Sequence, residues 1–133
     1  MKHVSVQAGA NPLNSIHANT EIHCEIETIA LRNMIEHTVA HAFEITTHEL
    51  RAPTRCRAQV ALARQVAMYL AHVAYGFTLT EVGRLFSRDR TTAAHACRLI
   101  EDKRDDPAFD VSLDSLEIAL RAWAQARQLS SVA

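Results

Sequence analysis

Residues 77–101 constrain the fold most, because they contain two helical patterns separated by only a few residues. In the first pattern Thr78 can cap a helix, and Glu81 lies at the spacing of a capping box. The second begins near Arg90, where the carboxylate of Asp89 can accept the free N–H groups of a first turn. A short helix, a tight turn and a second helix make up a helix-turn-helix motif. The segment therefore predicts this motif.

Apolar residues at helical spacing also dominate the rest of the chain after the first 25 residues. These patterns cover about 26–43, 60–75 and 110–128. Gly76 can end the second of them, and we expect Pro107 to end the helix that begins near Arg90. Only three glycines and three prolines occur in 133 residues, so few residues interrupt the helical patterns. The predicted fold class is all-α.

The domain organisation follows from the same patterns. Residues 1–25 are weakly patterned, and we expect them to form a mobile N-terminal tail. Residues 26–106 are predicted to form the helix-turn-helix domain, and residues 107–133 an additional amphipathic C-terminal helix. Thr46 or Thr47 is expected to cap a short helix before an irregular basic loop at residues 51–59.

The formal net charge of −1 conceals a strong asymmetry along the chain. Residues 51–104 carry ten basic and four acidic side chains, whereas residues 1–50 carry two basic and six acidic ones. Residues 105–133 carry two basic and five acidic side chains. A basic middle between acidic flanks is typical of a surface that binds a polyanion. The alternative on charge alone is a solvated charged face.

The second helix of the motif divides into an inward and an outward face. At its N-terminal tip, such a helix meets base edges in the major groove of DNA. We interpret His95 as a packed helix histidine rather than as a DNA-reading residue. The residues expected to face inward are Ala93, Ala96, Cys97 and Ile100, and those left off this stripe are Arg90, Thr91, Thr92, His95 and Arg98.

Two sequence blocks resemble the C-terminal DNA-binding domain of the bacterial replication initiator DnaA. They are the Arg-Asp-x-Thr-Thr-x-x-His-Ala run at residues 88–96 and Arg64-Gln65 followed by Ala-Met-Tyr-Leu at residues 67–70. The resemblance covers roughly residues 27–106. It implies a Trp-repressor-like helical bundle that binds double-stranded DnaA boxes. The positions that match the family's base-reading residues are Asp89, Arg90, Thr91 and Thr92.

The resemblance also implies contacts to the DNA backbone or the minor groove. A basic loop ahead of the long helix has this role in the family, and here that loop holds Arg55 and Arg57. Arg64 and Gln65 match family positions near phosphates, and Arg88 flanks the reading tip. We add Arg98, on the outward face of the recognition helix, to the predicted backbone contacts.

The sequence departs from the family pattern at three places. Ser87 stands where the family usually has two glycines, so the turn is one residue shorter and the recognition helix is expected to be re-aimed slightly. Arg90 replaces a histidine, and arginine is a good bidentate donor to guanine. Ala63 stands where the family frequently has a proline, and alanine suits a helix interior. We expect DNA binding with an altered sequence preference.

No GxxxxGK[ST] phosphate loop occurs, so we expect no nucleotide binding. We also expect the protein to be a free-standing relative that lacks the ATPase module of the family. The predicted function is sequence-specific binding of double-stranded DNA, regulating replication initiation or transcription. One alternative is a protein-interaction modulator of the DnaA initiator or of its regulatory inactivation complex, with little DNA binding of its own. Another is a repressor carried by a phage or mobile element.

Neither an enzyme nor a metal or cofactor site is predicted. His37 and His41 have i, i+4 spacing, but no third ligand accompanies them in a known motif. The three cysteines, with no CxxC spacing, favour a reducing cytosol. With no apolar run long enough to span a membrane, we expect a cytoplasmic, nucleoid-associated protein. Trp123 and its leucine stripe are either core or a partner surface.

Overall fold

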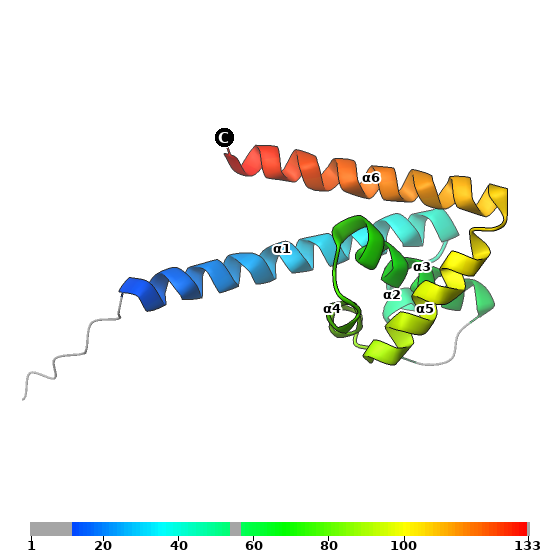
Figure 1. Cartoon of the computed structure of the whole chain (residues 1–133), viewed down its shortest axis with the longest axis horizontal. Coiled ribbons are helices and arrows are strands. Elements are labelled where there is room, and N and C mark those ends of the chain that lie inside the picture. The colour runs from blue at the N-terminus through cyan, green and yellow to red at the C-terminus, as the bar shows by residue number, and fades with distance from the viewer. Residues whose placement is uncertain (1–11, 54–56, 133) are drawn as a thin grey trace, which may run out of the picture. The chain divides into compact units, whose positions relative to one another are not determined.

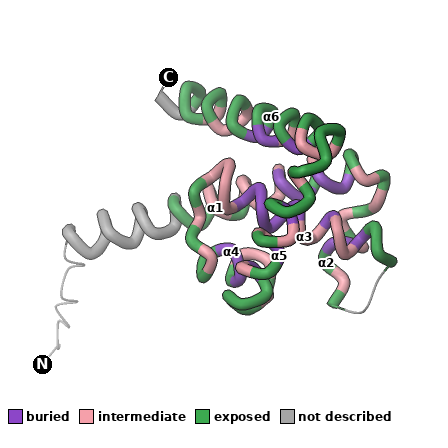
Figure 2. The backbone as a smooth tube through the Cα atoms, turned by 45° about the vertical axis from the view of Figure 1, so that its right-hand side comes forward, coloured by how far each residue is buried: buried purple, intermediate pink, exposed green. Residues whose placement is uncertain are grey.

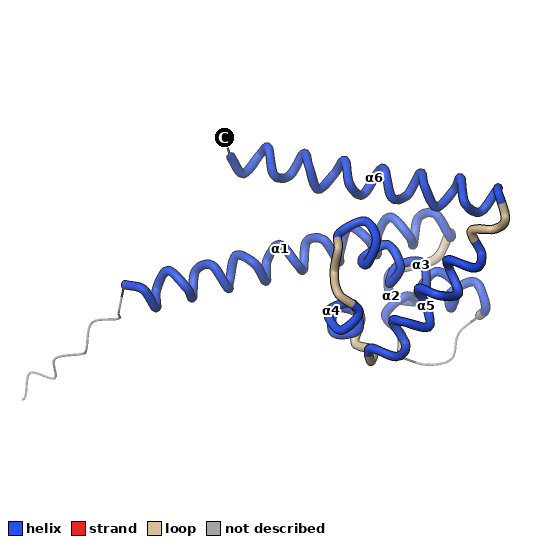
Figure 3. Tube along the Cα trace, viewed as in Figure 1, coloured by secondary structure: helices blue, strands red, loops and turns tan. Residues whose placement is uncertain are grey.

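The computed structural model describes residues 12–53 and 57–132, and within them the side chains of residues 24–53 and 57–130. Every regular element in these residues is a helix, which confirms the predicted all-α class (Figures 1 and 3). The helices are α1 (Pro12–Phe43), α2 (Thr47–Arg51), α3 (Ala58–Tyr75), α4 (Leu79–Leu85), α5 (Arg90–Lys103) and α6 (Pro107–Val132).

The chain divides into two compact units between Leu31 and Arg32. The described part of the first unit, residues 12–31, is the first part of α1. This helix begins earlier than the pattern from about residue 26 predicts, with a proline at the first helical position, where the missing N–H costs nothing. Residues 12–25 of the predicted tail therefore lie in α1, and residues 1–11 lie outside the described residues.

The second unit is built around α3, which contacts α2, α4, α5 and α6. Figure 2 shows buried segments on the inner sides of these helices. Burying these apolar side chains removes them from water and supplies the main favourable free energy of folding. The buried residues of α3 are Val60, Ala63, Val66, Ala67, Met68, Tyr69, Leu70 and Ala71.

Local capping signals set several helix ends where the sequence predicts them. Thr46 and Glu49 form a complete capping box at α2, with the Thr46 N–H donating to Glu49 Oε2 at 2.8 Å and the Glu49 N–H to Thr46 Oγ1 at 3.1 Å. At α4 the Thr78 hydroxyl accepts the N–H of Glu81 at 3.2 Å. Gly76 ends α3 with φ of 71°, a left-handed conformation that glycine adopts without steric cost.

Pro107 has a different role from the one predicted. Helix α5 ends at Lys103, and Pro107 is the first residue of α6. The Asp106 side chain accepts the N–H of Ala108 at 3.1 Å and so satisfies a free donor of the first turn. Proline starts a helix as readily as it stops one, and the packing of α6 on α3 selects the first role here.

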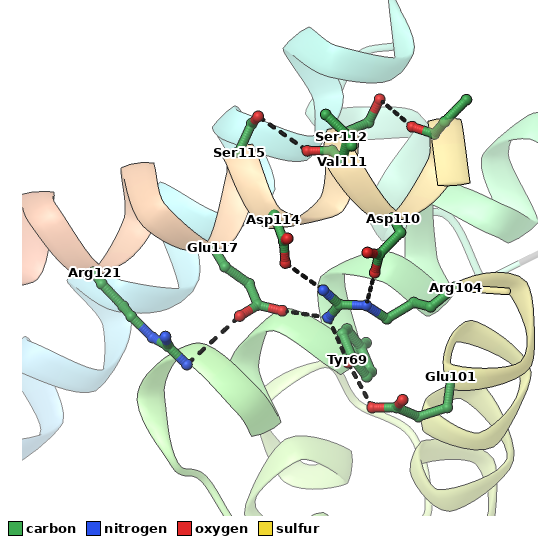
Figure 4. A network of polar contacts seen from close by, with 11 residues as sticks. Tyr69, Glu101, Arg104, Asp110, Val111, Ser112, Asp114, Ser115, Glu117 and Arg121 are labelled. Carbon is green, nitrogen blue, oxygen red and sulfur yellow. Dashed lines mark hydrogen bonds and ion pairs between the residues drawn. The ribbon is translucent and has the colours of Figure 1, made fainter. Parts of the chain in front are cut away.

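Within the second unit, a polar cluster fastens α6 to α3 and to the end of α5 (Figure 4). The guanidinium of Arg104 pairs with Asp110 at 2.5 Å and with Glu117 at 2.7 Å, and also with Asp114. It donates to the hydroxyl of Tyr69 at 2.9 Å, and this hydroxyl donates to Glu101 at 2.6 Å. Burial, together with the Glu101 hydrogen bond, raises the pKa of Tyr69 to about 12.

The leucine stripe of α6 belongs to the core in its first half. Leu113 and Leu120 are buried, and the Tyr75 hydroxyl donates to the carbonyl of Leu120 at 3.1 Å. Trp123 is half-buried and lies under the guanidinium of Arg127, 5.6 Å from the ring centre. Across the described ranges, none of the helices combines the length and apolar character needed to cross a membrane.

Candidate nucleic-acid interface

The helices α4 and α5 meet at a tight turn that depends on Gly83. Its carbonyl accepts the N–H of Arg88 at 2.7 Å, and it is buried against the turn. A Cβ atom at this position would lie 2.7 Å from the Arg88 carbonyl oxygen and 3.0 Å from the carbonyl carbon of Asp89. Sequence reasoning missed this residue. An isolated glycine inside a helical pattern was the available signal, because a glycine in that place often has a packing role.

Ser87 adopts φ of 55° in this turn, which is the left-handed region. Non-glycine residues pay a steric cost there because Cβ crowds the following carbonyl. The turn therefore places a serine in a conformation that glycine adopts without steric cost, at the position where the resemblance predicts glycine.

Asp89 is the N-cap of α5, as predicted. Its Oδ1 accepts the backbone N–H of Thr92 at 2.7 Å. This hydrogen bond lowers the pKa of the Asp89 carboxyl, which keeps the cap ionised at the positive end of the helix dipole. The carboxylate thus fixes the geometry of the helix tip. Its direct contact with a base remains a prediction.

The outward face of α5 carries the predicted base-reading side chains. Ala93, Ala96 and Ile100 are buried and Cys97 is half-buried, which confirms the inward stripe. The exposed residues at the N-terminal tip and along the outward face are Asp89, Arg90, Thr91, Thr92, His95 and Arg98. The interpretation of His95 as a packed residue is wrong. It lies one turn beyond Thr91 and so shares the exposed face.

The basic loop before α3 is described in part. Arg55 and Cys56 lie outside the described residues. Arg57, just before α3, is exposed and pairs with Glu49 at 2.9 Å. The Thr46 N–H is the main group that lowers the pKa of Glu49, and Arg57 lowers it further. An exposed ion pair of this kind contributes little stability, so Arg57 can exchange Glu49 for another anion at small cost.

Arg64 holds the other side of this loop. Its guanidinium donates to the carbonyl of Leu50 at 2.8 Å and of Glu49 at 3.0 Å, and also to Ala52. These carbonyls are the free acceptors at the C-terminal end of α2. Arg64 therefore has a structural role, and its phosphate contact remains a prediction. Gln65 on α3 and Arg88 in the turn are both half-buried. Their contacts with the DNA backbone also remain predictions.

The histidines and cysteines do not assemble into a larger cluster in the part of the chain that the structure describes. No group of three or more metal-binding side chains gathers within these residues. His37 and His41 are both exposed on α1. Burial raises the pKa of the Cys97 thiol, which disfavours the reactive thiolate.

A capped recognition helix with an exposed polar tip, joined to α4 by a close turn, defines a helix-turn-helix DNA-binding protein. Residues 33–100 match the family described as the bacterial dnaA protein helix-turn-helix. The chain belongs to this family, which confirms the resemblance.

Similar proteins include chromosomal replication initiator proteins DnaA from three bacteria. That of Lachnoclostridium phytofermentans is 35% identical over 92 residues, which are 68% of this chain and 20% of the relative. That of Symbiobacterium thermophilum is 38% identical over 90 residues, or 66% and 19%. That of Bifidobacterium animalis subsp. lactis is 42% identical over 69 residues, or 51% and 12%. The chain thus spans about a fifth or less of the length of these relatives.

Proposed function

We propose that this protein binds specific double-stranded DNA sites related to DnaA boxes and thereby regulates replication initiation or transcription. The observation that carries the proposal is the tip of α5, where Arg90, Thr91 and Thr92 are exposed and held in place by the Asp89 cap. Side chains at this end of a recognition helix reach base edges in the major groove.

The charge of the surrounding segment supports the same proposal. Residues 51–104 have an excess of six basic side chains, which attracts the phosphate backbone. In this proposal Arg57 and the rest of the 52–57 loop contact the backbone or the minor groove. Arg98 contacts a phosphate further along α5. Each neutralised phosphate lowers the slope of log affinity against log salt concentration by roughly 0.9.

Selection of duplexes from a random pool at two salt concentrations tests the proposal. A DnaA-box-like consensus is expected. The preferred base should differ at the position that Arg90 reads, because Arg90 stands where the family pattern has a histidine. An absence of enriched duplexes, together with recovery of initiator proteins from nuclease-treated extracts, would favour the protein-interaction alternative.

The variant Arg90→Ala tests the reading role directly. We expect it to weaken binding by about 1–3 kcal/mol and to relax preference at one base pair. Lys103→Ala is the matched control, because Lys103 is exposed at the opposite end of the same helix. Gel shifts in which Arg90→Ala binds as tightly and selectively as the unmodified protein contradict the assignment.

A further inference from the structure

A pocket of about 210 Å³ lies behind the helix-turn-helix turn, within the second unit. Residues of α1, α2, α3, α4 and the turn line it. Its charged lining is unusual, because it includes four arginines and a single glutamate. These residues are Arg32, Arg51, Arg64, Arg88 and Glu36.

The single carboxylate leaves one donor of the Arg32 guanidinium without a hydrogen bond. Glu36 is only 4% exposed, and Arg51 Nε donates to its Oε2 at 2.7 Å. Arg32 Nε lies 4.0 Å from the other oxygen, too far for a hydrogen bond. That nitrogen is buried and has no hydrogen-bond partner among the described residues. Buried polar groups in folded proteins are almost always paired, so this donor indicates a missing acceptor.

We propose that this pocket binds a phosphate group. Guanidinium groups match the geometry of phosphate oxygens and bind them with two parallel hydrogen bonds. A dianion would offset the excess positive charge and supply an acceptor to Arg32 Nε. Met68, Leu85 and Phe86 also line the pocket, and their apolar surface strengthens an ionic contact by lowering the local dielectric.

The size of the pocket limits the ligand. Pockets that enclose whole small molecules measure about 300–1,000 Å³, and this one is smaller. It has room for a phosphate or diphosphate group. Any larger remainder of the ligand would stay outside.

Glu36 separates this proposal from a purely structural ion-pair network. Its carboxylate accepts a hydrogen bond from Arg51 and lies 4.0 Å from Arg32 Nε, so it competes with a phosphate for these two guanidinium groups. Removing this negative charge is expected to strengthen phosphate binding. In a purely structural network the same change would have no such effect.

The position of the pocket suggests a consequence for the turn. Ser87 and Arg88 both line it, and both belong to the segment that orients α5. Two sources of phosphate fit this chemistry, a free phosphorylated ligand and the DNA backbone. Bound duplex would block the pocket if its ligand is a backbone phosphate, and would leave it open if its ligand is a free phosphorylated molecule.

Titration of the full chain with inorganic phosphate and pyrophosphate, at constant ionic strength and without DNA, tests the site. The arginine Nε–H resonances in NMR spectra report on it. We expect saturable shifts for Arg32 and Arg51, at least tenfold weaker binding in Arg32→Gln and at least threefold tighter binding in Glu36→Gln. Lys103→Gln, at an exposed basic residue near the end of α5 and outside the pocket, is the control and should bind phosphate normally.

Shifts that never saturate, or that are equal in all variants, would overturn the proposal. Should Arg32→Gln fail to fold, the Glu36→Gln titration alone decides the question. A repeat with saturating duplex assigns the source. Loss of the phosphate shifts assigns the pocket to a backbone phosphate, and persistence assigns it to a free ligand. Because the first titration contains no DNA, its outcome does not depend on the proposed DNA-binding function.

Discussion

The substitution Gly83→Ala tests the packing that joins α4 to α5. The added Cβ would approach the Arg88 carbonyl oxygen to 2.7 Å and the Asp89 carbonyl carbon and oxygen to 3.0 Å. All three atoms belong to the backbone, so no flexible side chain can move aside. The turn itself must shift, and with it the tip of α5.

The expected cost follows from three contributions. Overpacking a tight site costs about 1–3 kcal/mol, and disturbing the 2.7 Å hydrogen bond from Arg88 to the Gly83 carbonyl costs about 1 kcal/mol more. Alanine regains about 1 kcal/mol over glycine through its higher helix propensity. We therefore expect a net destabilisation of about 1–3 kcal/mol.

Urea unfolding measures the stability, and fluorescence anisotropy with a labelled duplex measures the binding. DNA affinity should fall by more than the loss of folded protein explains, because the recognition helix is re-aimed. The control is Gly76→Ala. It adds a Cβ in open space but keeps φ at 71°, and is expected to cost about 1 kcal/mol with unchanged DNA affinity. If Gly83→Ala is as stable as the unmodified protein and binds DNA equally well, the packing argument is refuted.

Three further predictions concern the turn, the α6 cluster and alkaline pH. Ser87→Gly relieves a left-handed serine and should raise stability by about 0.5–1 kcal/mol, whereas Ala119→Gly, at an exposed helical position, should lower it by a similar amount in the same urea assay. Arg104→Ala leaves a buried carboxylate on α6 without its main partner and should cost about 3 kcal/mol; limited proteolysis should then cut within α6, and an uncut helix contradicts the clamp. Burial raises the pKa of Tyr69 and Tyr75 to about 12, above the unfolded value of about 10. The protonated form is therefore favoured by folding, so the contribution of these two tyrosines to stability should be constant below pH 10. It should fall as the pH rises towards 12, and the fall should be less steep in Tyr75→Phe.

The candidate interface was predicted from sequence to the extent that it is local. Asp89 caps Thr92, and the inward stripe of α5 is buried, because both follow from positions three or four residues apart. His95 was assigned wrongly, because a histidine fits either face of a helix and only its neighbours decide. Arg64 was predicted from sequence as a cation near DNA. Its hydrogen bonds to carbonyls at the end of α2 were not predicted, because they join residues 12 to 15 positions apart.

By itself, the sequence determined the helical class, the helix-turn-helix, most helix caps and the family. These features depend on periodicity, on side chains that bond their own backbone within one turn, and on a motif of contiguous residues. The tertiary structure alone decided that Pro107 begins a helix, that Gly83 has no room for a side chain and that four arginines share a pocket with Glu36. Each of these facts depends on atoms that meet in space across a turn or between separate helices, and the periodicity of the chain does not specify which atoms meet.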